Sequence, residues 1–101
     1  MLFRSRYLSR QVVIVGCGRV GGRIARMLRE QDVPFVVVEA NREIVERLRA
    51  NHEAAVWGDA AEPEVLVQAH IRDAQALVIA TPDTLQVRAM VETAQIGRAH
   101  V

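Results

Sequence analysis

Four short aliphatic runs, each followed by an amphipathic stretch, constrain the fold of this chain more than any other feature. The runs cover residues 12–15, 35–38, 54–57 and 76–80. Nearly continuous apolar runs of this length are typical of strands that are covered on both faces, as in a parallel sheet. After each run, apolar residues recur at helical spacing, within residues 20–28, 44–48, 65–69 and 85–91.

The order of these segments predicts the architecture. Parallel strands need crossover connections, and these are right-handed in nearly all proteins. Four strand–helix units in succession therefore predict an α/β fold, a Rossmann-like, doubly wound parallel sheet of at least four strands with helices on both faces. Asn41 is a candidate N-cap of the second helix, and Pro63 suits the first turn of the third. Thr81, followed by a proline and an acid, predicts the start of the fourth.

Length and composition exclude several classes of protein. The chain has 101 residues, of which 50% are hydrophobic and 25% charged, which predicts one globular domain with one core and no separate substrate domain. No apolar run approaches the roughly 20 residues of a membrane-spanning helix. A formal net charge of +1 gives no reason to expect binding to nucleic acid, and a single cysteine fits a reducing compartment.

Residues 1–10 are predicted to form a basic tail or linker ahead of the domain, which spans residues 11–101. Arg4, Arg6 and Arg10 fall in this segment, and it has no clear periodicity. A basic segment can lie against an anionic membrane leaflet. The general behaviour of chain termini favours a solvated tail instead.

A glycine-rich turn follows the first aliphatic run. Gly16, Gly18 and Gly21 form the pattern G-x-G-x-x-G between a predicted strand and a predicted helix, the context in which this pattern indicates nucleotide binding. Gly16 permits the sharp turn, Gly18 lets a pyrophosphate approach the backbone, and Gly21 lets the helix pack near the sheet. The helix N-terminus then offers unpaired N–H groups to phosphate. The alternative is that the glycines serve only a tight turn.

Glu39 ends the second run, 23 residues after Gly16 (39 − 16). At such a position a carboxylate accepts hydrogen bonds from an adenosine ribose and repels a 2′-phosphate, so NAD-type ligands are favoured over NADP. Arg42, three residues further on, weakens that exclusion. The alternative is that Glu39 is a helix-capping charge.

Two more strand ends carry candidate polar groups, because ligands of such sheets bind at the carboxyl ends of the strands. Asp59, within Gly58-Asp59-Ala60, is predicted to accept a hydrogen bond from an adenine amino group. Thr81 is predicted to reach a phosphate or a second ribose. Each residue also fits an ordinary turn or cap.

Together these segments resemble a known family. They read VIVGCGRVG at residues 13–21, VVE at 37–39, WGDA at 57–60 and VIATPD at 78–83. They resemble the TrkA-N domain, the nucleotide-binding half of the RCK (KTN) regulatory modules of potassium channels and transporters. The resemblance is strongest to the cytoplasmic domain of Kef-type (YbaL-like) monovalent cation:proton antiporters, and it covers about residues 11–95.

The resemblance implies regulation rather than catalysis. Such domains bind NAD(H), AMP or ATP, usually as homodimers, and their ligand state biases a membrane-embedded cation transporter or antiporter, fused or separate, from the cytoplasmic side. Carried over by position, Arg19 would join the glycine turn around the phosphates, although it suits a solvated helix surface equally well. No catalytic residue is implied. The candidate cofactor-binding residues are Gly16, Cys17, Gly18, Arg19, Val20, Gly21, Glu39, Ala40, Asn41, Asp59, Ala60, Ala80, Thr81 and Pro82.

The C-terminus departs from the family pattern, which continues with a loop and a fifth strand that ends near an Arg-x-His or Arg-x-Arg pair. Arg98-Ala99-His100 is either a vestige of that pair, reached by a short connection, or part of a truncated tail. Two other functions stay open. The chain could be the N-terminal fragment of an NAD-dependent oxidoreductase, whose acid–base residue this sequence does not place, or a fold whose ligand site has decayed.

The remaining chemically distinctive side chains are expected to be structural. Cys17 lies at a helix N-terminus, where a thiolate is stabilised, but it lacks a resolving cysteine and is predicted to be a small buried residue. His52, His70 and His100 lack metal-ligand spacing, so no metal is expected. Trp57 is predicted to lie in the core, with the alternative that its edge borders an adenine pocket.

Overall fold

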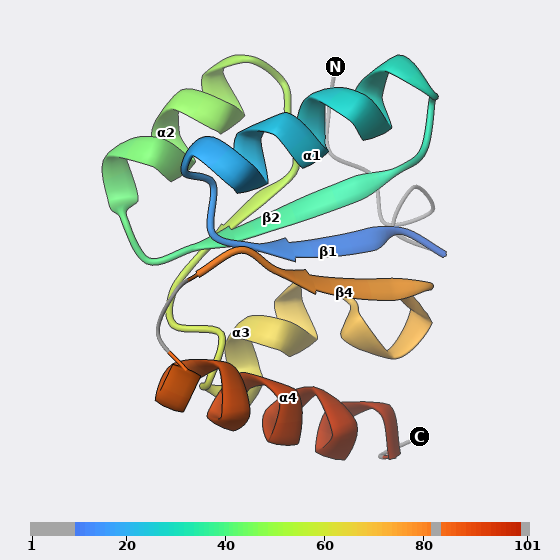
Figure 1. The fold of residues 1–101 in the computed structure, drawn as a ribbon, viewed down its shortest axis with the longest axis vertical. Coiled ribbons are helices and arrows are strands. Elements are labelled where there is room, and N and C mark those ends of the chain that lie inside the picture. Colours follow the sequence, from blue (N-terminus) through green and yellow to red (C-terminus); the bar gives the residue numbers. More distant parts are fainter. Residues whose placement is uncertain (1–9, 82–83, 100–101) are drawn as a thin grey trace.

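Strands and α-helices alternate along the described part of the chain (Figure 1). The structure is a computed structural model that describes residues 10–81 and 84–99. The elements are β1 (Val12–Val15), α1 (Arg19–Glu30), β2 (Phe35–Glu39), α2 (Arg42–Ala50), β3 (Ala55–Trp57), α3 (Pro63–Gln68), a 3₁₀ turn (Ile71–Asp73), β4 (Ala76–Ile79) and α4 (Thr84–Ala99). None of the described helices is both long and apolar enough to cross a membrane.

The four strands form one parallel sheet in the order β3-β2-β1-β4. Val12 of β1 pairs with Phe35 of β2 on one side and with Ala76 of β4 on the other. The chain crosses from β3 at one edge to β4 at the other, so the direction of winding reverses beside β1. The predicted Rossmann-like sheet is therefore confirmed, and the carboxyl ends of all four strands meet at one edge.

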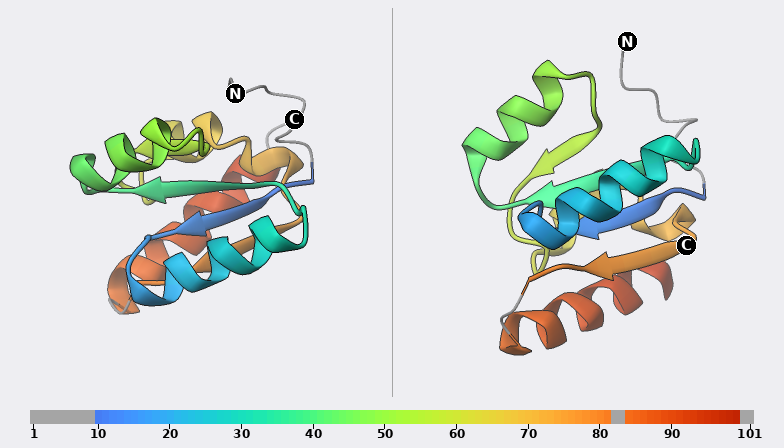
Figure 2. Two further views of the ribbon diagram at one scale, coloured as in Figure 1. Left: turned by 90° about the horizontal axis from the view of Figure 1, so that it is seen from above. Right: turned by 45° about the horizontal axis from the view of Figure 1, so that its top comes forward.

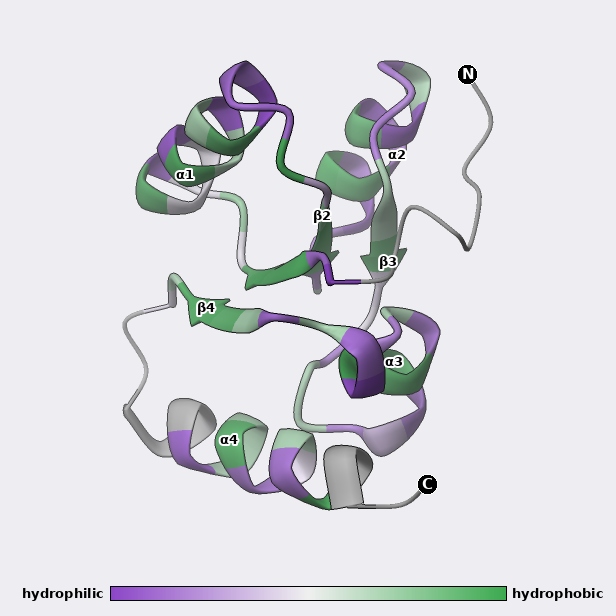
Figure 3. Cartoon of the chain, turned by 90° about the vertical axis from the view of Figure 1, so that its right-hand side faces the viewer, coloured by the Kyte–Doolittle hydropathy of each residue, from purple (hydrophilic) through white to green (hydrophobic). Residues whose placement is uncertain are grey.

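Side chains of the central strands alternate between two cores, one on each face of the sheet. Figure 2 shows the helices that cover the two faces. Val12 and Ile14 of β1 pack with Ala25 of α1 and Val45 of α2. The intervening valines of β1 pack on the other face with Leu66 of α3 and with α4. All of β1 is buried as a result. Figure 3 shows the strands as strongly hydrophobic, with polar residues concentrated on the helices.

A buried glutamine fixes the amino end of β1. Gln11 is fully buried, and its Nε2 donates hydrogen bonds to the carbonyl oxygens of Ala69 (2.8 Å) and His70 (2.9 Å), just after α3. These bonds satisfy carbonyl groups that a helix end leaves without partners. Gln11 thus ties α3 to the sheet at the end opposite to the carboxyl ends of the strands.

The predicted starts of the second and third helices are confirmed. Asn41 is the N-cap of α2, and its Oδ1 accepts a hydrogen bond from the backbone N–H of Glu43 at 3.0 Å. Pro63 lies in the first turn of α3. The described part of the fourth helix begins at Thr84, whereas the predicted start lies at Thr81-Pro82-Asp83. Residues 82–83 lie outside the described residues.

The sequence leaves two alternatives open for Arg98-Ala99-His100, a vestige of the family's pair near a fifth strand or part of a truncated tail, and the first two of these residues form no strand. Arg98 and Ala99 lie in α4, which runs through Ala99, and His100 lies outside the described residues. The helix continues because strong helix formers such as Ala, Leu, Gln, Arg and Met fill most of its length.

The prediction that Trp57 lies in the core is also wrong, because 52% of the residue is exposed. It ends β3, an outer strand of the described sheet, so it has a neighbouring strand on one side only. Its indole N–H donates a hydrogen bond to the carbonyl oxygen of Ala40 at 3.0 Å. The guanidinium of Arg42 lies over the ring, 5.3 Å from its centroid.

Candidate functional site

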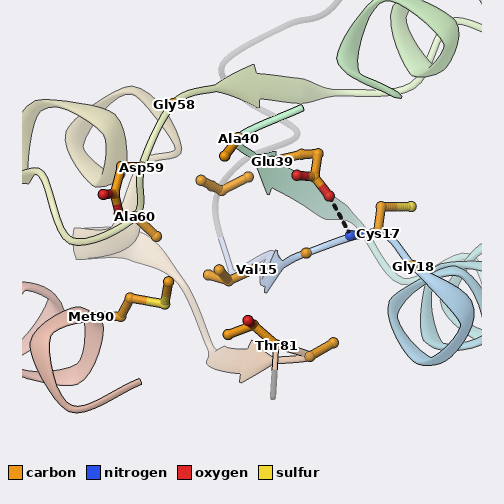
Figure 4. Close-up of a pocket in the computed structure, with 13 residues that line it drawn as sticks. Val15, Cys17, Gly18, Glu39, Ala40, Gly58, Asp59, Ala60, Thr81 and Met90 are labelled. Carbon is orange, nitrogen blue, oxygen red and sulfur yellow. Dashed lines mark hydrogen bonds between the residues drawn. The ribbon is translucent and has the colours of Figure 1, made fainter. Parts of the chain in front are cut away.

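A pocket of about 250 Å³ opens at the carboxyl ends of the strands, where the direction of winding reverses (Figure 4). Ligands of open α/β sheets bind at this kind of crevice. It is lined by Val15, Gly16, Cys17, Gly18, Val38, Glu39, Ala40, Gly58, Asp59, Ala60, Ala80, Thr81 and Met90.

The N-terminus of α1 begins at this pocket without a side-chain cap. Its N-cap is Gly18, no side chain caps the first turn, and that turn contains no acid. The neighbouring α2 differs, because Asn41 caps it and Glu43 lies in its first turn. The N–H groups and the partial positive charge of α1 are therefore available to an anion from outside the helix.

The glycines of the turn have three distinct structural roles. Gly16 has φ +91°, a conformation that other residues adopt with strain. A Cβ on Gly21 would overlap the carbonyl oxygen of Gly16 and would lie 3.5 Å from the Cβ of Ala80. A Cβ on Gly18 would meet no protein atom within 4 Å. The fold thus requires glycine at residues 16 and 21, whereas the space beside Gly18 is open.

Glu39 at the end of β2 points into the pocket toward the glycine turn (Figure 4). Its Oε1 accepts a hydrogen bond from the backbone N–H of Cys17 at 3.0 Å, and its Oε2 accepts one from the N–H of Asn41 at 2.9 Å. These bonds fix the carboxylate in place. A carboxylate offers about four acceptor positions, so each oxygen keeps acceptor capacity for a ligand.

The loop after β3 brings Asp59 to the pocket. Gly58 has φ +151°, and a Cβ there would lie 2.5 Å from the side chain of Val65, so the loop packs closely on α3. The N–H of Gly58 also donates to the carbonyl oxygen of Glu39 at 3.0 Å, which couples the ends of β2 and β3. Asp59 is exposed, and its Oδ1 accepts from the N–H of Ala61 at 2.9 Å.

The structure brings most of the predicted site residues together. Those that line the pocket are Gly16, Cys17, Gly18, Glu39, Ala40, Asp59, Ala60, Ala80 and Thr81. Those that do not line it are Arg19, Val20, Gly21 and Asn41, and Pro82 lies outside the described residues. Arg19 and Val20 are exposed in the first turn of α1, Gly21 is buried against Gly16, and Asn41 caps α2.

Sequence reasoning missed four lining residues, Val15, Val38, Gly58 and Met90. Val15, Val38 and Gly58 directly precede predicted site residues, so their position at the strand ends was a usable signal. Met90 lies on α4, and no local pattern connects it with the glycine turn. It reaches the pocket because α4 packs against α3 on the same face of the sheet.

Alkylation of Cys17 is expected to be slow at neutral pH. Burial, and secondly the negative charge of Glu39, raise the pKa of this thiol above its usual value. The folded state therefore holds the proton more tightly than the unfolded chain does. The stability that this provides is present below the pKa of the unfolded thiol and is lost as pH rises through the folded-state pKa.

The measurement is the rate of iodoacetamide modification against pH, with the same chain in concentrated urea as the control. The midpoint in the folded protein should lie at higher pH. An equal or lower midpoint would mean that α1 stabilises the thiolate.

Among the described residues, no group of three or more His, Cys, Asp or Glu side chains could hold a metal ion.

Comparison with known proteins identifies the family. The model of the TrkA-N domain matches residues 12–100, which is most of the chain. The chain belongs to the TrkA-N family. This TrkA-N domain is 33% identical to the putative cation/proton antiporter YbaL of Escherichia coli over 92% of its own length and 18% of the antiporter. It is 35% identical to the Trk system potassium uptake protein TrkA homolog of Pyrococcus horikoshii, over 69% of this chain and 31% of that protein.

Solved structures share the fold of this TrkA-N domain. The TrkA-N domain of the inner membrane protein YbaL from Escherichia coli superposes with a TM-score of 0.86 at 31% identity, covering 92% of this chain and 69% of that chain. The NAD(P)-binding domain of an exopolyphosphatase-related protein from Archaeoglobus fulgidus gives 0.77 at 16% identity, covering 86% of this chain and 65% of that one. The second likeness concerns the fold alone. The chain spans only 18% of the length of the antiporter YbaL and 31% of the length of the TrkA homolog.

Proposed function

We propose that this TrkA-N domain binds an adenine nucleotide, NAD(H), AMP or ATP, and regulates a potassium or other cation transporter or antiporter without catalysing a reaction. One arrangement carries the proposal. Glu39, an acid suited to a sugar diol, is held within hydrogen-bonding distance of the turn that leads into the uncapped N-terminus of α1. An acceptor for ribose and donors for phosphate thus share one pocket.

The geometry supports one orientation of the ligand. Phosphates would lie beside Gly18, where the space is open and the N–H groups of α1 are uncapped. The ribose hydroxyls would donate to Glu39, and the adenine amino group would donate to Asp59. Thr81, at the end of β4, would lie near the phosphates or a second ribose. A 2′-phosphate would meet the negative charge of Glu39, which favours NAD-type ligands over NADP.

Regulation would follow from differential binding. The relatives of this domain are named as cation/proton antiporters and potassium uptake proteins, which supports a membrane transporter as the partner, with this domain at its cytoplasmic face. A nucleotide that binds one arrangement of a domain pair more tightly than another shifts the transporter toward the matching state. The pair itself follows from the family resemblance, and sedimentation equilibrium across working concentrations tests it.

Replacing Glu39 with glutamine is expected to weaken nucleotide binding by about 10- to 100-fold, because charge-assisted hydrogen bonds to the sugar are lost. Isothermal titration calorimetry with NAD⁺, NADH, AMP and ATP measures the effect. Glu64→Gln is the matched control, since it removes the same charge from an exposed residue of α3 that does not line the pocket.

The same variant tests how the acid acts. If Glu39 excludes a 2′-phosphate by its charge, the preference for NAD⁺ over NADP⁺ should shrink in Glu39→Gln and persist in Glu64→Gln. A purely structural role for Glu39 would weaken both ligands equally. Nucleotide affinity that is unchanged in Glu39→Gln would reject the proposed site.

A further inference from the structure

We propose that Trp57 is a positioning residue, which holds the carboxylate of Glu39 in the orientation that the pocket uses. Trp57 itself does not line the pocket, and it acts through the peptide unit between Ala40 and Asn41. That Glu39 accepts hydrogen bonds from a sugar rests on the proposed function. The restraint on Glu39 does not, because every contact that makes it lies within the protein.

Glu39 and Trp57 are neighbours on two parallel strands. They are register partners at the carboxyl ends of β2 and β3, so their side chains leave the sheet on the same face. Val37 and Ala55, two residues earlier in the same register, mark that face, since both belong to the core beside α1 and α2. The backbone N–H of Gly58 also donates to the carbonyl oxygen of Glu39 at 3.0 Å. The end of β3 therefore holds the backbone that carries the acid.

One peptide unit links the indole of Trp57 to the carboxylate. At one end of this unit, the carbonyl oxygen of Ala40 accepts a hydrogen bond from the indole N–H at 3.0 Å. At its other end, the N–H of Asn41 donates to Oε2 of Glu39 at 2.9 Å. Because a peptide unit is planar, fixing the direction of its carbonyl group also fixes the direction of its N–H. Trp57 thus sets the position of a donor on which Glu39 depends.

The carboxylate has two anchors among the described residues, and Trp57 acts on one of them. The backbone N–H of Cys17 donates to Oε1 at 3.0 Å, which directs the acid toward the glycine turn (Figure 4). Asn41 holds Oε2. Two bonds to different oxygens fix the rotation of the carboxylate, whereas the bond to Cys17 alone leaves it free to turn. Losing the hold of Trp57 therefore loosens the orientation of Glu39 without removing its charge.

The exposure of Trp57 favours a role of this kind. The residue is 52% exposed, so burial alone does not account for a large apolar side chain at this position. Its ring is held by the guanidinium of Arg42, 5.3 Å from the ring centroid, and Nε of Arg42 lies 3.3 Å from Oε1 of Glu46. The start of α2 therefore orients the indole, whose N–H is directed at Ala40.

The first test is calorimetric titration of the parent chain, Trp57→Phe and Trp57→Leu with NAD⁺ and with AMP. Phenylalanine keeps an aromatic ring beside Arg42 and removes the N–H donor. We expect Trp57→Phe to bind about 3- to 10-fold more weakly, the effect of one exposed hydrogen bond, and Trp57→Leu to lose about as much. If Trp57→Phe keeps the parent affinity and Trp57→Leu loses it, the ring acts by contact and the inference is wrong.

Combining Trp57→Phe with Glu39→Gln tests whether the two residues act together. If Trp57 works through Glu39, the double variant should bind as weakly as Glu39→Gln alone, within about 2-fold. Losses that multiply would show that Trp57 acts independently of the acid. Such a result would also overturn the inference.

A second readout needs no nucleotide. The negative charge of Glu39 is, after burial, the second cause of the raised pKa of the Cys17 thiol. If the carboxylate loses an anchor, the midpoint of Cys17 alkylation against pH should move lower in Trp57→Phe, in the same direction as in Glu39→Gln. The variant leaves unchanged the other charges that act on this thiol, which are those of Glu53, Arg29 and Arg47.

The outcomes separate this inference from the proposed function. A lowered alkylation midpoint in Trp57→Phe, with no binding of any adenine nucleotide, would reject the proposed function and keep the positioning role. An unchanged midpoint with parent-like nucleotide affinity would reject the positioning role and keep the proposed function. If no nucleotide binds and the midpoint does not move, both fail. Val67→Ala is the control and should behave like the parent, because Val67 is 63% exposed on α3 and does not line the pocket.

Discussion

Replacing Gly21 with alanine is expected to destabilise the fold by about 3 kcal/mol, at the upper end of what overpacking costs. The new Cβ would overlap the carbonyl oxygen of Gly16 and would come within 3.0 Å of its carbonyl carbon. The backbone of Gly16 cannot move freely, because this residue lies in a positive-φ turn and its N–H donates a hydrogen bond to the carbonyl oxygen of Val38 at 2.8 Å. Relief requires that α1 move away from the sheet.

Thermal unfolding followed by circular dichroism measures this effect. A loss of that size lowers the Tm of a domain of about 100 residues by about 10–20 °C. Gly22→Ala is the control in the same helix, since its Cβ points into open space and alanine favours a helix over glycine by about 0.5–1 kcal/mol. The two alanine variants should therefore shift Tm in opposite directions. A Tm of Gly21→Ala within 2 °C or so of the parent would contradict the packing described here.

Replacing Gly18 with alanine is expected to weaken nucleotide binding by about 10- to 100-fold while the domain stays folded. A Cβ at Gly18 meets no protein atom within 4 Å, so the change costs at most about 1 kcal/mol, from the weaker N-cap. The same Cβ would enter the space beside the N-terminus of α1, where the phosphates are proposed to lie. A larger side chain in Gly18→Val should deepen the loss.

Calorimetry and thermal unfolding on the same samples separate the two glycines. Gly18→Ala should lose affinity with only a small fall in Tm, and Gly22→Ala should keep its affinity with a somewhat raised Tm. Nucleotide affinity that is unchanged in Gly18→Ala and Gly18→Val would show that phosphate does not approach α1 at this residue. A fall in Tm as large as that of Gly21→Ala would show that the space beside Gly18 is not open.

The sequence predicts the order of elements and the centre of the site because both depend on local pattern. Residues 12–15 and 35–38 are apolar throughout since both faces of β1 and β2 are covered. Gly16 and Glu39 are recognisable as site residues from local sequence. Gly16 lies in the turn directly after β1, and Glu39 is the last residue of β2. Parallel pairing then places both at the same edge of the sheet.

Features that depend on neighbours in space are not predictable in this way. Trp57 follows an apolar run like that of an inner strand, but the strand order leaves β3 at the edge and its last side chain exposed. Met90 enters the pocket only because α4 packs on α3. Arg98 lies in α4, although the family pattern places a strand near this point of the chain. The helix extends this far because residues with a high helix propensity fill most of residues 84–99.

The hydrogen bond from Trp57 to Ala40 has a practical consequence. Trp57 is the only tryptophan of the chain, and its indole is anchored 3.0 Å from the carbonyl oxygen of a residue that lines the pocket. Arg42 lies over the same ring. The tryptophan fluorescence of the protein, excited selectively near the red edge of the indole band, therefore originates from one side chain at the rim of the pocket, and ligand titrations can be followed optically without a label.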